Sequence, residues 1–177
     1  MDGNEVRIVE PGSETVLEPG GIGMIEVRGP CVFKGYWRMP EKTAEELRPN
    51  GFFMTGDLGQ VSDDGYLSIV GRQKDLIITG GYNVYPKEIE DVLNDVAGVL
   101  ESAVYGVHDP DFGEKIIAAV VPESDSKPET AELTAIVKDK LARFKHPREF
   151  QVMEALPRNT MGKVQKNVLR DNYAEEN

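Results

Sequence analysis

The sequence is poor in residues that bind metals or form disulfides. Cys31 is the only cysteine, and the two histidines, His108 and His146, lie far apart. One cysteine cannot form an intramolecular disulfide, so a reducing compartment, the cytoplasm, is expected. No combination of these residues has the close spacing of zinc ligands. The sequence therefore predicts a cytoplasmic protein without a structural metal.

Long hydrophobic runs are also missing. The longest, Ile116–Val121, is far shorter than the roughly 20 residues of a membrane-spanning helix. The first residues, MDGNEVRIVE, contain neither the basic nor the apolar stretch of a secretory signal. We therefore expect no transmembrane segment and no secretory signal.

Positive charge is scarce, because 20 Lys and Arg face 31 Asp and Glu, for a net charge of −11. Nonspecific binding of nucleic acid needs clustered positive charge and is not expected. One segment differs: LPRNTMGKVQKNVLR contains Arg158, Lys163, Lys166 and Arg170 and no acidic residue. Any chemistry on phosphate is therefore expected to be local.

The length of 177 residues, 40% of them hydrophobic, fits one globular domain, or one small domain and a piece of another. Up to about Val70, the pattern predicts strands at 5–9 and 23–29, with a short helix at 39–48. A hairpin is expected at 59–70, and a polar loop without periodicity, GRQKD, at 71–75.

From Leu76 onward, strands and helices alternate, and together they predict an α+β fold. The helix expected at 128–144 should bury Leu133, Ile136, Val137, Leu141 and Phe144 on one face. Strands are expected at 76–79, 99–107, 115–121 and 149–153; helices at 85–96, 128–144 and 163–173; and a loop at 80–84.

Two stretches have side chains suited to a nucleotide. In FFMTGDLG, Asp57 is expected at a tight glycine turn, where a carboxylate can accept hydrogen bonds from both hydroxyls of a ribose. In GRQKDLIITGGYNVYPKEIE, the Arg72 fork suits ribose or phosphate oxygens, and Gly80 and Gly81 allow close approach of a ligand to the backbone. Taken alone, each stretch is better explained by ordinary turns and a surface arginine.

Lys163 follows Gly162 in the acid-free segment, but the segment is not a phosphate-binding P-loop. That motif needs glycine where Pro157 stands and serine or threonine where Val164 stands. The lysine is therefore either solvated or inserted into the active site of another domain.

Taken together, these three stretches resemble successive signature motifs of the adenylate-forming enzymes, which include acyl-CoA synthetases, peptide-synthetase adenylation domains and luciferases. The preceding stretch, GMIEVRGPCVFKGYWRMPEKTAEEL, resembles the segment before those motifs. The resemblance extends from about Ile22 to Arg170. The sequence looks most similar to malonyl-CoA synthetases within the family.

The resemblance implies a division at residue 73. Residues 1–73 correspond to the tail of a large adenylation domain, and residues 74–177 to a mobile C-terminal lid domain. By the same likeness, Asp57 and Arg72 bind the ribose of ATP, and Lys74 is the hinge about which the lid rotates.

The resemblance also implies two steps of chemistry. Lys163 serves the adenylation step, in which a carboxylic acid attacks ATP. Gly80 and Gly81 line the tunnel of coenzyme A, whose thiol then attacks the acyl-adenylate. Luciferases have a lysine at the position of Ile78, and the chain stops at DNYAEEN without a carrier domain, so CoA is the expected acceptor.

Other family motifs are absent, among them the phosphate loop, the adenine-binding and Mg²⁺-ligating motif and the acyl pocket. They are expected upstream of Met1, in a missing large domain that would hold most of the ATP and Mg²⁺. The chain is therefore expected to be a fragment of an ATP-dependent acid–thiol ligase, inactive alone. Two alternatives stay open: a noncatalytic module that binds a nucleotide, CoA or a partner, and a small α+β interaction domain unrelated to ATP.

The sequence leaves the roles of Lys166 and Arg170 open, between keeping the local field positive and contacting CoA phosphates. The acyl substrate and the oligomeric state are not encoded in any residue that we identify.

Overall fold

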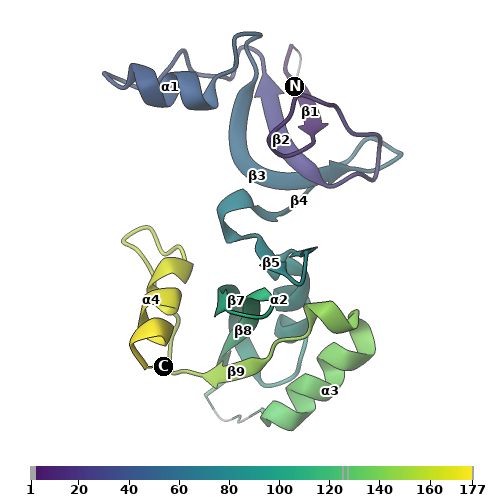
Figure 1. Cartoon of the computed structure of the whole chain (residues 1–177), viewed down its shortest axis with the longest axis vertical. Coiled ribbons are helices and arrows are strands. Elements are labelled where there is room, and N and C mark those ends of the chain that lie inside the picture. Colours follow the sequence, from purple (N-terminus) through teal and green to yellow (C-terminus); the bar gives the residue numbers. More distant parts are fainter. Residues whose placement is uncertain (1–2, 125, 127, 177) are drawn as a thin grey trace. The chain divides into compact units, whose positions relative to one another are not determined.

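The computed structural model describes residues 3–124, 126 and 128–176. The chain divides into two compact units, Met1–Lys74 and Asp75–Asn177 (Figure 1). Sheets whose strands are mainly antiparallel and separate helices build them, which confirms the α+β class. Within the described part of the chain, no helix is long and apolar enough to cross a membrane.

The first unit is a four-stranded antiparallel sheet whose strands pair in chain order. Helix α1 (Pro40–Glu46) begins at a proline that suits the first turn, as predicted. The four strands of the sheet are β1 (Glu5–Val9), β2 (Gly23–Arg28), β3 (Phe53–Val61) and β4 (Leu67–Arg72). The predicted β3–β4 hairpin is confirmed, with a turn at 62–65 closed by a 2.9 Å hydrogen bond from the Gly65 amide to the Ser62 carbonyl.

Strand β3 curves strongly in the first unit (Figure 1). Two interruptions of pairing register explain the curvature, one between Met24 and Glu26 in β2 and one between Leu58 and Gly59 in β3. A Cβ at Gly59 would lie 2.5 Å from the Ser68 carbonyl oxygen, so only glycine fits there.

The expected loop at 71–75 is wrong in its first two residues. Gly71 and Arg72 do not belong to a loop, because they end β4 and pair with Leu58 and Asp57 of β3. The polar sequence has no period of its own, but backbone pairing with β3 extends the strand through it. Only residues Gln73–Asp75 leave the sheet, as a single 3₁₀ turn, η1.

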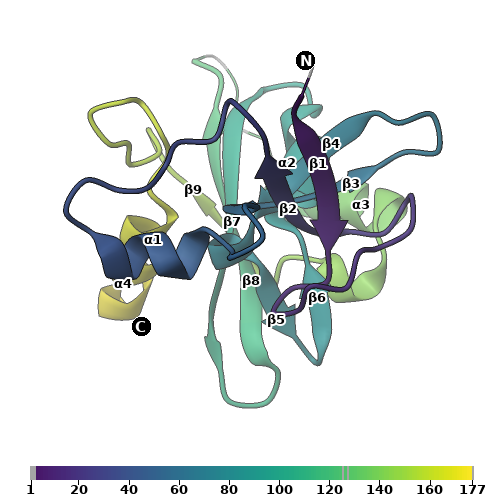
Figure 2. The ribbon, with the colours of Figure 1, turned by 90° about the horizontal axis from the view of Figure 1, so that it is seen from above.

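The second unit has a five-stranded mixed sheet in the order β6-β5-β8-β7, with β9 parallel to β8. The two long strands that the sequence predicts here, β7 and β8, form an antiparallel hairpin (Figure 2). The strands are β5 (Ile77–Thr79), β6 (Tyr82–Val84), β7 (Val99–Asp109), β8 (Gly113–Pro122) and β9 (Glu149–Val152), and the helices are α2 (Pro86–Asn94), α3 (Thr130–Lys140) and α4 (Lys166–Glu176).

Helices cover both faces of this sheet (Figure 1). Alternation along β7 sends Val104 to the face packed by α2 and α3, and Tyr105 to the face packed by α4. Ile89 and Leu93 of α2 are fully buried on the first face, which matches their predicted spacing. The sheet is therefore a two-sided core that fixes all three helices.

Three predicted boundaries in the second unit are wrong. Residues 80–84 are not a loop, because Gly80 and Gly81 form only the turn of a β5–β6 hairpin. Helix α3 ends at Lys140, where Leu141 adopts an extended conformation, and Phe144 is exposed instead of buried in the core. Its ring stacks on Tyr82, with centroids 4.6 Å apart, so this contact replaces the last helical turn. Helix α4 begins at Lys166, later than expected.

Candidate functional site

Asp57 and Arg72 face each other across β3 and β4. Arg72 Nε lies 2.7 Å from Asp57 Oδ1, and the two side chains are 51% and 24% exposed. Asp57 was expected at a turn, and this expectation is wrong, because it lies inside β3. The backbone is still unusual there, since Gly56 has φ +74 and the Asp57 amide donates a 3.1 Å hydrogen bond to Thr55 Oγ1.

Arg72 also lines a pocket of about 400 Å³ in the first unit. Lys74 lies at the same pocket, and Tyr36 and Glu46 form another part of its wall. The Tyr36 hydroxyl donates a 2.6 Å hydrogen bond to Glu46, which raises the pKa of the tyrosine and lowers the pKa of the carboxyl. The pocket therefore combines fixed charges of both signs.

Gly80 and Gly81 have φ of +56 and +81, the left-handed pair that a tight two-residue hairpin turn requires. The Gly80 amide donates a 2.8 Å hydrogen bond to the Phe112 carbonyl, which ties the turn to the loop between β7 and β8. Side chains at these positions would strain the turn. The glycines therefore serve the hairpin, whatever else they do.

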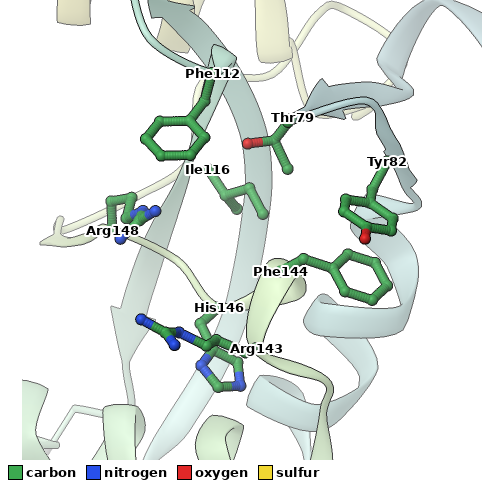
Figure 3. A pocket seen from close by; sticks show the side chains of 9 residues that line it. Thr79, Tyr82, Phe112, Ile116, Arg143, Phe144, His146 and Arg148 are labelled. Atoms are coloured by element: carbon green, nitrogen blue, oxygen red, sulfur yellow. The ribbon is translucent and has the colours of Figure 1, made fainter.

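Gly80 lines a pocket of about 390 Å³ in the second unit (Figure 3). Three basic side chains meet there, Arg143, His146 and Arg148, beneath the Phe112 ring. The rings of Tyr82 and Phe144 form a second wall (Figure 3). Aromatic faces and cationic groups in one pocket suit a ligand with a flat ring and phosphates.

Sequence reasoning did not find this pocket. The sequence feature that could have indicated it is the run RFKHPR at 143–148, which contains four basic or titratable side chains. Phe144 belongs to this run, but Tyr82 of β6 and Phe112 of the β7–β8 loop come from elsewhere in the chain, so only the fold brings the three rings to one pocket.

Lys163 lies on the second arm of a small hairpin before α4. Its side chain is exposed, and within the part of the chain that the structure describes its ammonium has no hydrogen-bond or ion-pair partner. The other cations of the acid-free segment are all paired with acidic side chains from elsewhere in the second unit: Lys166 with Glu90, Arg170 with Asp75 and Arg158 with Glu101.

These pairs bear on the roles that the sequence left open. Lys166 Nζ lies 2.6 Å from Glu90 Oε1, and both side chains are largely buried. Arg170 Nε donates a 3.2 Å hydrogen bond to the Gly106 carbonyl, and its terminal nitrogen lies 3.4 Å from Asp75. Both residues therefore hold α4 to the rest of the second unit. Among the described residues, Lys163 is the one cation of this segment without a partner.

Residues 88–163 match the family model of the AMP-binding enzyme C-terminal domain. The second unit of this chain therefore contains an AMP-binding enzyme C-terminal domain, and its homologues are acyl-CoA ligases. A putative acyl-CoA ligase of Bacillus subtilis, YdaB, is 43% identical over 96% of this chain and 33% of its own length.

The particular likeness is to MatB of Rhodopseudomonas palustris, a malonyl-CoA synthetase. Its ATP-bound crystal structure is 53% identical to this chain with a TM-score of 0.93, over 98% of this chain and 34% of MatB. Its apo structure has the same identity and coverage and a TM-score of 0.75. The chain thus spans about a third of the length of the relatives it matches.

Proposed function

We propose that this chain is part of an ATP-dependent acid–thiol ligase that converts a carboxylic acid into an acyl-adenylate and then into an acyl-CoA. The observation that carries the proposal is the Lys163 ammonium, which has no partner among the described residues and lies on an exposed, internally bonded hairpin. The 53% identity with MatB supports malonyl-CoA synthetase as the subgroup.

In the first step, a carboxylate oxygen of the acid attacks the α-phosphorus of ATP, the bond from this phosphorus to the bridging oxygen breaks, and pyrophosphate leaves. Negative charge gathers on the phosphoryl oxygens in the transition state. An ammonium placed before the reaction stabilises that charge where it develops. Lys163 suits this role, because no carboxylate of the part of the chain that the structure describes pairs with it, whereas Lys166 and Arg170 are paired with Glu90 and Asp75.

Asp57 and Arg72 are proposed to bind the ribose of ATP. Their contact uses one carboxylate oxygen and the Arg72 Nε. The second oxygen of Asp57 and the terminal nitrogens of Arg72 are left to meet vicinal hydroxyls and ring oxygens. Both residues stand on paired strands, so little ordering is needed when the nucleotide binds.

The second step needs CoA, and we assign its nucleotide end to the pocket beside Gly80. Arg143 and Arg148 suit the phosphates, and the Tyr82, Phe112 and Phe144 rings suit adenine. Gly80 and Gly81 leave room beside the turn for the pantetheine arm, whose thiol attacks the acyl-adenylate and releases AMP. The acyl group therefore passes from phosphate to sulfur.

Movement between the two steps is proposed to occur at Lys74, between a large-domain tail at 1–73 and a lid at 74–177. Lys74 is exposed and lies in the short 3₁₀ turn that separates β4 from β5. The matching segments of ATP-bound and apo MatB have the same identity to this chain, but their TM-scores are 0.93 and 0.75. This difference between the two MatB structures supports such movement in that relative.

Mg²⁺ is proposed to travel with the ATP phosphates and to be held by other residues of the complete ligase. The described residues contain no group of three His, Cys, Asp or Glu that could hold a metal ion. No step above depends on this chain binding the ion. The exposed free thiol of Cys31 supports a reducing, cytoplasmic location.

The test replaces Lys163 with alanine in the complete ligase that contains this chain. We expect ATP–pyrophosphate exchange to fall about a hundredfold or more. Lys140→Ala, which removes an exposed lysine of α3, serves as the control. An unchanged exchange rate in Lys163→Ala would contradict the proposal, and CoA binding without any adenylation would favour the noncatalytic module.

A further inference from the structure

We propose that Arg158 is a positioning residue for the adenylation step, because it holds the turn that carries Lys163 in one conformation. The inference rests on the proposed function of Lys163 and adds a residue to which no role has been assigned. Arg158 does not act on the substrate in this proposal. It acts through the backbone of the turn.

The Arg158 guanidinium bonds in two directions at once. One terminal nitrogen donates a 2.6 Å hydrogen bond to the Gly162 carbonyl, on the residue before Lys163. The other donates to the carboxylate of Glu101 on β7, which anchors the turn to the central sheet of the unit. The planar fork of arginine can make both bonds, whereas a lysine ammonium has no such fixed geometry.

The turn itself is closed by a small set of backbone bonds. The Asn159 amide donates to the Lys163 carbonyl at 2.9 Å, and the Gly162 amide donates to the Asn159 carbonyl at 2.9 Å. The Asn159 side-chain oxygen accepts from the amides of Met161 and Lys163, at 3.0 and 2.9 Å. Gly162 has φ +78, a conformation that glycine adopts without strain.

Hydrophobic packing holds only the base of this hairpin. Leu156 is buried, and Val164 packs against the same core cluster as Tyr105 and Leu169. The tip is in solvent, with Met161 74% exposed. Beyond the base, therefore, the contact from Arg158 to Glu101 is what ties the turn to the rest of the unit within the described residues.

The exposure of the pair decides what its loss should do. Arg158 and Glu101 are 43% and 27% exposed, and ion pairs of this kind contribute little to the free energy of unfolding. A catalytic ammonium, in contrast, loses much of its effect when it is displaced by about an ångström. Losing Arg158 should therefore slow adenylation more than it destabilises the fold.

The test compares Arg158→Gln, Glu101→Ala and the double variant in the complete ligase, with Lys163→Ala as reference and Lys140→Gln as the charge-matched control. Adenylation is followed by ATP–pyrophosphate exchange, and thioester formation by single turnover from synthetic acyl-adenylate. We expect Arg158→Gln to lower adenylation about tenfold, with thioester formation and melting temperature near wild type. Glu101→Ala should show a smaller loss in the same step, and the double variant should lose no more than Arg158→Gln.

A readout without activity uses this chain alone. ¹⁵N relaxation of the Met161, Gly162 and Lys163 amides should report larger fast motion in Arg158→Gln, with α4 amides unchanged. Equal losses in both half-reactions, or an unchanged turn and an unchanged adenylation rate, would overturn the inference. So would a loss on Arg158→Gln that Glu101→Ala does not share, because that pattern indicates direct contact with substrate.

Failure of the inference is separable from failure of the proposed function. If Lys163→Ala abolishes adenylation and Arg158→Gln leaves it intact, only the positioning role is wrong. If Lys163→Ala leaves adenylation intact, the function of Lys163 is wrong and the positioning role falls with it.

Discussion

Arg72 Nε lies 2.7 Å from Asp57 Oδ1 because the register of β3 and β4 sets the two residues directly opposite each other. Cross-strand neighbours of opposite charge stabilise a sheet only modestly when they are exposed. The pair therefore contributes little to stability, which agrees with the proposal that it binds a ligand with hydroxyl groups.

Replacing Asp57 with asparagine should weaken nucleotide binding. Asparagine has a similar shape but loses the charge, so hydrogen bonds from the ribose hydroxyls and from Arg72 become weaker. We expect the KM for ATP in pyrophosphate exchange to rise about tenfold, since a hydrogen bond to a charged group is worth roughly 1.5–3 kcal/mol. Asp63→Asn, in the exposed turn of the β3–β4 hairpin, is the control, and equal KM values for the two variants would refute the ribose assignment.

Replacing Arg148 with glutamine should affect the CoA step and spare adenylation. Its guanidinium lies 5.3 Å from the centre of the Phe112 ring, at the mouth of the pocket beside Gly80. We expect the KM for CoA to rise about tenfold while pyrophosphate exchange stays unchanged. The preference for CoA over pantetheine, which lacks the nucleotide, should become smaller. An unaltered preference would contradict the proposal that this pocket binds the nucleotide end of CoA.

Replacing Lys166 with methionine should destabilise the second unit. Glu90 Oε1 accepts hydrogen bonds from the Lys166 ammonium at 2.6 Å and from the Val104 amide at 2.8 Å. The side chains of Lys166 and Glu90 are only 16% and 18% exposed. Loss of the ammonium leaves a partly buried carboxylate without its counter-charge, at a cost of about 1–3 kcal/mol.

Urea denaturation of the chain measures this cost. Lys163→Met is a matched control three residues earlier. Lys163 is exposed and has no partner among the residues that the structure describes, so this substitution should change the free energy of unfolding by less than about 0.5 kcal/mol. Equal effects of the two substitutions would show that the Lys166–Glu90 contact does not stabilise the unit.

Replacing Glu46 with glutamine should lower the pKa of Tyr36. The hydrogen bond to Glu46 is the main cause that raises this pKa above its ordinary value of 10.0, and the carboxylate charge adds to it. The same bond, followed by that from Lys42, lowers the pKa of Glu46 below 4.5. The contribution of Tyr36 to stability is therefore lost as pH rises through its folded pKa, and that of Glu46 as pH falls through its own.

An NMR titration of the tyrosine ring carbons tests this shift. In Glu46→Gln, the Tyr36 pKa should move toward 10.0. The pKa of Tyr85, which burial raises, should stay where it is, because Glu46 is not among its causes. A Tyr36 titration that is identical in both proteins would contradict the assigned hydrogen bond.

Much of the fold could be predicted from local patterns. The i, i+4 spacing of Ile89 and Leu93 identified helix α2, because an amphipathic helix repeats its buried positions at a fixed period. The apolar runs identified β7 and β8, because a strand that is buried on both faces has a continuous apolar sequence. The errors lie where distant segments decide the backbone. Pairing with β3 extends β4 through Arg72, and Phe144 lies outside the predicted helix and stacks on the ring of Tyr82.

The candidate site, like the fold, could be predicted only in part from the sequence. By itself, the sequence determined the α+β class, the family resemblance and the positions of Asp57, Arg72 and Lys163, since residue types and their spacing along the chain are one-dimensional information. Only the tertiary structure decided which charges are paired. Lys166 is neutralised by Glu90 of another helix, whereas Lys163 meets no carboxylate among the described residues, because electrostatic partners are set by distance in space and not by distance along the chain.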